Sequence, residues 1–310
     1  MISSDLKLPY GICYGPHRDG QDPTRNIHPN EMDLNQDVIF LSKLTKRIRT
    51  YSSQGISDVI KNLDKNKVKV NLGISLDVNS PTNSEIEVSN AKNILTKYSD
   101  LIDCITVGNE VLAQVIWDSH LDLGNVTPMI KNKLDKIKTT QITPYIADLK
   151  KAVSQSNNKN IRVTTAEPWR IWQDHQDLID NVDVITAHIH PYWDGQDISH
   201  AADYVLQTYN DVMSLGKIHG KNVIIGETGW PTHGARIGNA IPSPDNQKIF
   251  LQKFLNMIAI PEYYIFEAFD EKWKEMYGLV EGHWGLYDSK GMTKHDLSIL
   301  SGISSENNWR

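Results

Sequence analysis

The chain has 310 residues, of which 39% are hydrophobic and 23% charged, and its net charge of −6 comes from acidic and basic residues mixed along the sequence. This composition is ordinary for a globular protein and excludes the basic surface that binds nucleic acid or anionic lipid. No segment approaches the roughly 18 apolar residues of a membrane-spanning helix, so we expect no membrane insertion. Eight Trp and twelve Tyr against five Phe favour a neutral, polar ligand, because those rings combine an apolar face with a polar edge.

Eight short runs of β-branched or apolar residues recur along the whole chain. Several are apolar almost without interruption until their last residues, which is typical of strands buried on both faces of a parallel sheet. The predicted strands cover residues 11–15, 47–52, 68–76, 104–110, 161–168, 182–192, 222–230 and 263–271.

Segments with helical spacing lie between these strands. Residues 243–245 (Ser-Pro-Asp) form a typical helix start, and one apolar stripe contains Ile142, Ile146, Leu149 and Val153. The alternation of strand and helix predicts a parallel sheet, and eight units in about 300 residues fit a single-domain (β/α)8 barrel over 1–310. A doubly wound open sheet is the alternative, but the turn after its first strand is usually Gly-rich, and here it reads GPHRDG.

Three features depart from this regular pattern. Residues 111–140 are predicted to form an extended loop after the fourth strand, either walling one end of a cleft or lying as a surface insertion. Residues 303–310 form a polar tail. The start, MISSDLKLPYG, lacks the apolar core of a signal peptide. The protein is therefore intracellular, or secreted, periplasmic or cell-surface with an export signal outside this chain, and we expect the second.

The two cysteines, Cys13 and Cys104, each lie inside an apolar run. A disulfide or a metal-binding pair is the functional alternative. Two cysteines so far apart make no disulfide framework, and we expect both to be small buried core residues.

Two glutamates lie at the ends of predicted strands. Glu110 directly follows VGN at the end of the fourth strand, and Glu227 lies late in the seventh, in IIGETGW. The C-terminal strand ends form the catalytic face of a (β/α)8 barrel, so the two carboxylates are expected to face each other across a ligand. Roughly 5 Å apart, they would serve a retaining glycosidase. Either glutamate alone is compatible with a structural ion pair, whereas two on one barrel mouth favour catalysis.

Seven of the eight tryptophans fall at or just beyond C-terminal strand ends. Rings gathered at one mouth suit the apolar faces of sugars, and indole N–H groups donate to hydroxyls. Ordinary packing under loops is the alternative for two or three of them. The seven are Trp117, Trp169, Trp172, Trp193, Trp230, Trp273 and Trp284.

Polar residues inside the predicted barrel point to the same mouth. His188 and His190 alternate in AHIHPYW and so share one side of the sixth strand. We expect them to hydrogen-bond in a sugar site rather than to bind a metal, because no third ligand with suitable spacing is evident. Arg49 and Tyr51 share one side of the second strand. An arginine inside a barrel needs a carboxylate partner, and we expect Arg49 to help keep Glu227 ionised.

Two motifs, VGNE at 107–110 and GETGWPT at 226–232, resemble the acid/base and nucleophile motifs of glycoside hydrolase family 17. That family has a (β/α)8 barrel, and its members hydrolyse or transfer β-1,3-glucans. The form FEAFDE is closer to the bacterial and fungal branch than to the plant endoglucanases. Similar segments cover most of the chain: YGPHRDGQDP at 14–23, IRTYS at 48–52, HPYWDG at 190–195, FEAFDEKWK at 266–274 and HWGLYD at 283–288.

The resemblance implies Glu110 as acid/base and Glu227 as nucleophile. It also implies that Asn109 hydrogen-bonds the sugar beside the cleaved bond, that Trp284 stacks on sugar, and that a charged pair lies near the acid/base. The substrate-binding residues expected in all are Arg49, Tyr51, Asn109, Trp169, Tyr192, Trp230, Glu271, Lys274 and Trp284, of which Glu271 and Lys274 form the charged pair.

We therefore expect a monomeric retaining glycoside hydrolase that cleaves β-1,3-glucan without a metal or cofactor. Glu110 is expected to carry a proton before reaction, while Glu227 is ionised. Because the segment 111–140 departs from the compact pattern, endo and exo action stay open. Two alternatives remain: a β-1,3-glucanosyltransferase, and a non-catalytic β-glucan-binding protein, against which the intact glutamate pair argues.

Overall fold

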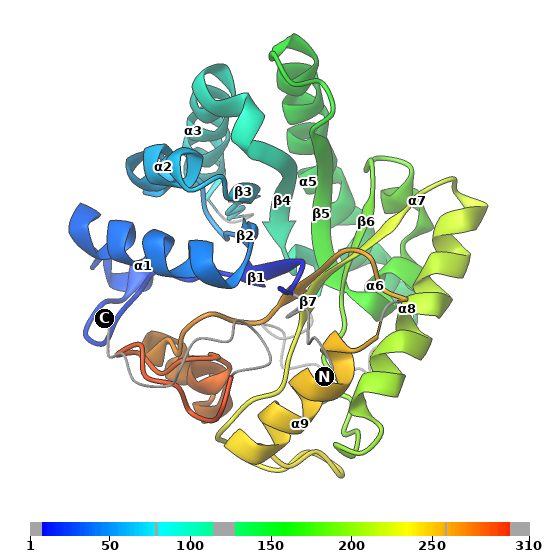
Figure 1. Ribbon diagram of the computed structural model, residues 1–310. Coiled ribbons are helices and arrows are strands. Elements are labelled where there is room, and N and C mark those ends of the chain that lie inside the picture. The colour runs from blue at the N-terminus through cyan, green and yellow to red at the C-terminus, as the bar shows by residue number, and fades with distance from the viewer. Residues whose placement is uncertain (1–7, 78–79, 114–127, 258, 298–310) are drawn as a thin grey trace.

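Eight parallel strands close into a barrel, each paired with the next in the chain and the last with the first. The structure, a computed structural model, describes residues 8–77, 80–113, 128–257 and 259–297. Figure 1 shows helices surrounding the strands, and the predicted (β/α)8 barrel is confirmed. The strands are β1 (Gly11–Cys13), β2 (Arg47–Arg49), β3 (Lys69–Ile74), β4 (Ile102–Asn109), β5 (Arg162–Pro168), β6 (Ile185–His188), β7 (Val223–Thr228) and β8 (Tyr263–Ile265).

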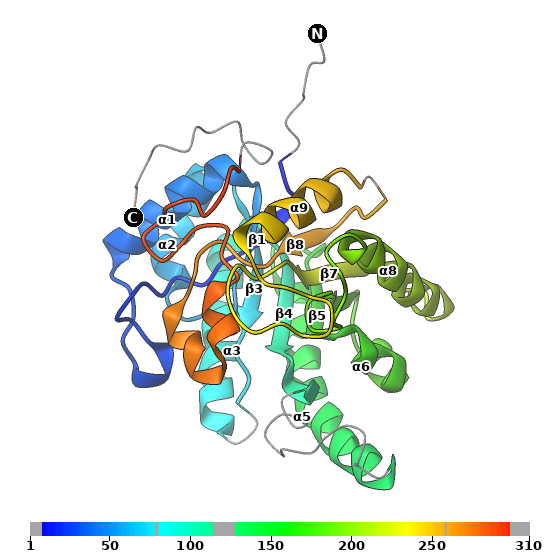
Figure 2. The same ribbon diagram turned by 90° about the horizontal axis from the view of Figure 1, so that it is seen from below.

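The helices follow the strands, and Figure 2 shows α1 and α2 on the opposite side of the barrel from α8. The helix start at residues 243–245 is confirmed, because the Ser243 side chain accepts a hydrogen bond from the Asn246 N–H. None of the helices in the described part of the chain is long and apolar enough to span a bilayer. The helices are α1 (Glu31–Leu44), α2 (Ile56–Lys65), α3 (Pro81–Tyr98), α5 (Pro128–Gln155), α6 (Trp169–Asp174), α7 (Gln176–Ile179), α8 (Ala201–Ile218) and α9 (Pro244–Leu255), with short 3-10 helices η1 (Pro23–Arg25), η2 (Ser99–Leu101), η3 (Lys272–Tyr277) and η4 (Leu279–His283).

Several strands are shorter than the sequence predicts. β8 ends at Ile265, whereas the prediction continued to residue 271, and β6 ends at His188 instead of 192. The residues that follow, rich in polar and aromatic side chains, leave the ladder and turn over the barrel mouth. The excess length therefore belongs to the loops that form the C-terminal face.

The prediction that residues 111–140 form an extended loop is wrong for residues 128–140. Helix α5 begins at Pro128, so residues 128–140 are helical and continue into the predicted apolar stripe. Proline is well suited to the first turn of a helix, since its missing N–H is not needed there. Residues 114–127 and the predicted polar tail at 303–310 lie outside the described residues.

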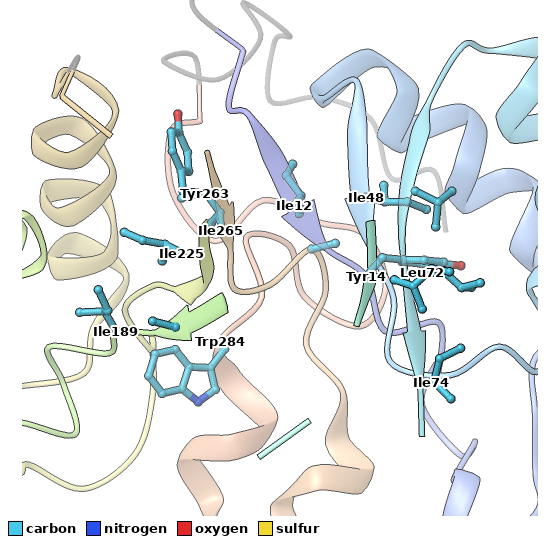
Figure 3. Packing of buried hydrophobic residues seen from close by; sticks show 14 of the residues in the cluster. Ile12, Tyr14, Ile48, Leu72, Ile74, Ile189, Ile225, Tyr263, Ile265 and Trp284 are labelled. Carbon is cyan, nitrogen blue, oxygen red and sulfur yellow. The ribbon is translucent and has the colours of Figure 1, made fainter. Parts of the chain in front are cut away.

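The core lies in two layers. The larger cluster packs outward-facing strand residues such as Ile12 and Ile48 against the helices (Figure 3). Inside the barrel, Cys13 and Cys104 belong to a smaller cluster with three apolar neighbours. Both cysteines are buried and free, which confirms their expected role as core residues.

Candidate active site

A kink in the backbone at the end of β4 presents Glu110 at the barrel mouth. The β4–β5 register shifts between Thr106 and Asn109, and Gly108 (φ 80°) and Glu110 (φ 54°) both have left-handed backbone conformations. The Glu110 N–H donates to the carbonyl of Ala166 on β5, at 2.7 Å. The Glu110 side chain keeps 20% of its surface exposed, so its carboxyl is accessible to a ligand.

Glu227 on β7 is more deeply buried, with 6% of its side chain exposed. Its Oε1 accepts hydrogen bonds from Arg49 Nη1 (2.6 Å) and the Tyr51 hydroxyl (2.8 Å), and its Oε2 lies 3.2 Å from His190 Nε2. Burial opposes ionisation of this carboxyl. The charges of His188 and Arg49 and the hydrogen bond from His190 outweigh it, and hold the pKa of Glu227 well below its usual range.

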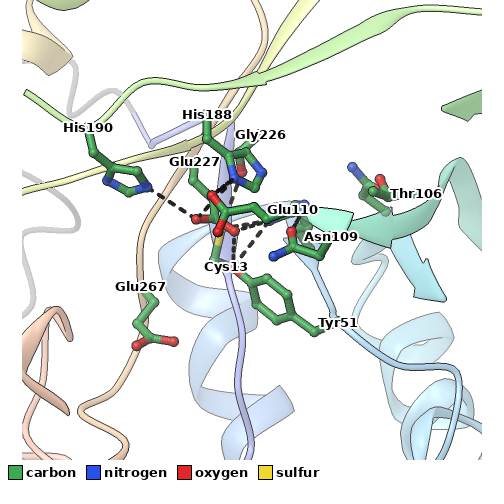
Figure 4. A network of polar contacts seen from close by, with 12 residues as sticks. Cys13, Tyr51, Thr106, Asn109, Glu110, His188, His190, Gly226, Glu227 and Glu267 are labelled. Carbon is green, nitrogen blue, oxygen red and sulfur yellow. Dashed lines mark hydrogen bonds and ion pairs between the residues drawn. The ribbon is translucent and has the colours of Figure 1, made fainter. Parts of the chain in front are cut away.

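His188 lies between the two carboxylates. Its Nδ1 is 2.9 Å from Glu110 Oε1 and 3.5 Å from Glu227 Oε2 (Figure 4). One atom from each of these three residues lies within 4.8 Å of the other two. One carboxyl oxygen of Glu110 thus lies within 4.8 Å of one carboxyl oxygen of Glu227, so the structure brings the two predicted glutamates together.

The same three atoms are close enough to hold a metal ion. However, both carboxyls already have a histidine as hydrogen-bonding partner: Glu110 Oε1 lies 2.9 Å from His188 Nδ1, and Glu227 Oε2 lies 3.2 Å from His190 Nε2. The hydrogen-bonding contacts expected for His188 and His190 are therefore present in the structure.

Arg49 bridges the two sequence motifs. While Nη1 bonds Glu227, Nη2 donates to Asn109 Oδ1 at 2.6 Å, and the guanidinium lies 4.8 Å from the centre of the Tyr51 ring. Because Arg49 has no accessible surface, its place is behind the two motifs, where it orients Glu227 and Asn109. The expected partnership of Arg49 with Glu227 is present, whereas direct contact of Arg49 with substrate is not possible in this structure.

A second charged group lies beside Tyr51. Lys274 pairs with Glu271 (2.6 Å), as expected, and also with the buried Glu267 (2.7 Å). Burial raises the pKa of Glu267 well above its usual range, against the attraction of Lys274. For Glu271, burial is outweighed by Lys274 and by His17, which hold the pKa of that carboxyl below its usual range. The pKa values of the two carboxyls that share this lysine are therefore shifted in opposite directions. The sequence interpretation missed Glu267, although it lies in FEAFDE.

The tryptophans divide into buried and accessible rings. Trp284 is 0% exposed and packs against His190, Tyr192 and Phe266, so the expectation that it stacks on sugar is wrong for this structure. Trp230 is also buried, with its indole N–H donating to the Ile241 carbonyl. Trp284 therefore lies behind His190, whereas Trp230 packs against Phe250 of α9.

Tyr192 is buried too, and its hydroxyl donates to the carbonyl of Ala235. Trp193, next to it, is 44% exposed and lies against both Tyr192 and Trp284. Trp169 is partly exposed, with its indole N–H donating to Asp194 at 3.3 Å and Arg170 over its ring. Trp193 is therefore the more accessible of these two rings, Trp169 is partly exposed with Arg170 over it, and Trp117 lies outside the described residues.

A family model, the BtgE/BtgC glycoside hydrolase domain, matches residues 11–285. A glucan endo-1,3-β-glucosidase, btgC of Emericella nidulans, is 26% identical over 94% of this chain and 44% of its own length. A glucan 1,3-β-glucosidase of Schizosaccharomyces pombe is 25% identical over 87% of this chain and 81% of its own. The chain spans less than half the length of the btgC relatives it matches.

Solved structures share the fold over nearly the whole chain. A glycoside hydrolase family 17 β-1,3-glucanosyltransferase from Rhizomucor miehei superposes with a TM-score of 0.73 and 26% identity, covering 95% of this chain and 98% of that one. An endo-laminarinase from Formosa has a TM-score of 0.74 at 21% identity, covering 96% and 89% of the two chains.

Proposed function

Since the chain belongs to the BtgE/BtgC glycoside hydrolase family, and its resemblance to glycoside hydrolase family 17 is confirmed, we propose that it cleaves β-1,3-glucan with retention at the anomeric carbon. The observation that carries this proposal is the pairing of Glu110 and Glu227, since one oxygen of each carboxyl lies within 4.8 Å of the other. Retaining enzymes have their carboxyl groups about 5–5.5 Å apart, whereas inverting enzymes need about 6.5–9.5 Å to admit a water molecule.

In the first step Glu227 is the nucleophile. Its carboxylate oxygen attacks the anomeric carbon as the bond from that carbon to the glycosidic oxygen breaks, and Glu110 gives its proton to the departing oxygen. In the second step Glu110, now a carboxylate, takes a proton from water. The water oxygen attacks the anomeric carbon and releases Glu227, and Glu110 is protonated again.

The other polar residues of the site support the two catalytic glutamates or contact the sugar. Arg49 and the Tyr51 hydroxyl stabilise the charge on Glu227, and Asn109 is held by Arg49 so that its amide nitrogen is available to the sugar beside the cleaved bond. The partly exposed Trp169 supports a more distant sugar residue. Lys274, paired with Glu271, lies beside the Tyr51 ring.

Replacing Arg49 tests how Glu227 is kept ionised. The nucleophile must be charged, and a low folded-state pKa keeps it charged in acid. We expect Arg49→Lys, which keeps the charge but loses the forked contact, and more strongly Arg49→Ala, to raise the pKa of Glu227. The acidic limb of the kcat/KM profile then moves to higher pH. Because leaving a buried carboxylate unpaired costs about 3–5 kcal/mol, folding of both variants is checked by thermal unfolding. An acidic limb that stays in place in the folded variants would rule out this role.

The proposed activity is tested with a time course of products from a β-1,3-glucan, run beside a mixed-linkage glucan and cellulose. We expect the β-1,3-glucan to be cleaved fastest and the first product, followed by proton NMR, to be the β-anomer. A first product of α configuration would exclude the retaining mechanism, and binding without any product would favour the non-catalytic alternative.

Transfer of the glycosyl group to another sugar is the second candidate function. The match to the Rhizomucor miehei β-1,3-glucanosyltransferase over 95% of this chain favours it. Both reactions share the glycosyl-enzyme and differ in whether water or a sugar hydroxyl attacks it. Oligosaccharides longer than the starting material, at high substrate concentration, would establish transfer, and their absence would leave hydrolysis alone.

A further inference from the structure

Glu167 is a buried carboxyl at the barrel mouth with no part in the steps above. It lies next to the last residue of β5 and has no accessible surface. Its Oε1 accepts a hydrogen bond from the Leu112 N–H at 2.9 Å, and its Oε2 accepts one from the Ala113 N–H at 3.3 Å. Both oxygens thus point at the backbone rather than at the space where a ligand would lie.

These N–H groups belong to the turn that follows Glu110. Residues 111–113 are helical, and the N–H groups of a first helical turn have no partner within their own helix. A side-chain oxygen usually caps them from the residue just before the helix. Here that residue is Glu110, whose carboxyl is turned to His188 instead, so the cap comes from the neighbouring strand.

Burial raises the pKa of Glu167 to about 8, against the effect of the Leu112 N–H. Burial alone therefore disfavours the ionised form of a glutamate at this position. Its hydrogen bonds to the turn are the compensation that the structure shows.

The adjacent residue of β5 holds Glu110 directly. The carbonyl of Ala166 accepts the Glu110 N–H at 2.7 Å, while Glu110 has a positive φ of 54°. A non-glycine residue in this region is strained and persists only where its surroundings fix it. Ala166 and Glu167 together fix the backbone on both sides of Glu110.

We propose that Glu167 is a positioning residue that holds the turn after β4, so that the Glu110 carboxyl is aimed at His188 and at the departing glycosidic oxygen. This inference rests on the proposed function, in which Glu110 donates the proton. Glu167 touches no substrate. Its loss should therefore impair proton donation more than it impairs nucleophilic attack by Glu227, which β7 and Arg49 hold independently.

The test compares leaving groups on aryl β-laminaribiosides. A dinitrophenolate leaves without a proton, whereas a methoxyphenolate needs one, so a poorly aimed acid affects only the second substrate. For Glu167→Ala we expect kcat/KM to fall by about 10- to 100-fold with the methoxyphenyl substrate, the size of effect that a misplacement of about 1 Å produces, and to change little with the dinitrophenyl substrate. Glu167→Gln, which keeps the shape and one acceptor oxygen, should show a smaller difference of the same sign.

Two controls make the outcome decisive. Thr164→Val, at a buried position on the same strand, removes a hydroxyl that donates to the Val184 and Thr165 carbonyls rather than to the turn, so both substrates should respond alike. Equal losses with both substrates, or none, in the folded Glu167→Gln variant would overturn the inference. Glu110→Ala is measured in parallel: if it shows no dependence on the leaving group, the proposed function itself fails.

Discussion

Glu227→Gln is expected to abolish turnover while leaving the fold intact. Removing the nucleophile of a hydrolase costs on the order of 10⁶ in kcat, because no covalent intermediate can form. Glutamine has the shape of glutamate and can still accept hydrogen bonds from Arg49 and Tyr51 through its amide oxygen. The thermal unfolding midpoint should therefore be little changed, and product release from a β-1,3-glucan measures the loss.

A matched control for this variant lies at the other end of the barrel. Glu262 precedes β8 and pairs with Arg162, so Glu262→Gln also removes a carboxylate from an arginine partner. That variant is expected to lose stability and to keep its kcat. Residual activity of Glu227→Gln above about 1% of wild type, in a preparation free of deamidated protein, would contradict the assignment of the nucleophile.

The order of the strands in the barrel and the location of the barrel mouth are predictable from the sequence. Near-continuous apolar runs predict parallel strands, and once the chain is a (β/α)8 barrel, Glu110 and Glu227 must share one face. The contact between Arg49 and Glu227 also follows, because a buried arginine needs a carboxylate and strand alternation points it inward.

The contacts that depend on register are not predictable in this way. The β4–β5 pairing slips between Thr106 and Asn109, and this slip brings Glu167 onto the turn after Glu110. Nothing in the alternation of residues indicates such a shift. The burial of Trp230 and Trp284 is not predictable either, since a position shortly after a strand or in a loop does not say whether a ring turns to the mouth or into the core.

Glu110→Ala is expected to lose activity in both chemical steps. Proton transfer by a positioned side chain contributes about 10²–10⁴-fold, so turnover of β-1,3-glucan should fall by that factor. With a dinitrophenyl substrate the first step needs no acid, and kcat/KM should be nearly preserved. The second step still lacks its base, so kcat falls and the glycosyl-enzyme accumulates, which a burst of dinitrophenolate would reveal.

Azide distinguishes the two glutamates in one experiment. In Glu110→Ala, azide needs no general base and enters beside the vacated carboxyl, on the face of the glycosyl-enzyme where water attacks, so the product is a β-glycosyl azide. In Glu227→Ala, azide replaces the nucleophile on the opposite face and gives an α-glycosyl azide from the same activated substrate. The configuration of the product shows from which face of the sugar the azide attacked. An α-glycosyl azide from Glu110→Ala would therefore mean that Glu110 is the nucleophile and Glu227 the acid/base. If azide rescued neither variant, the assignment of both catalytic glutamates would be contradicted.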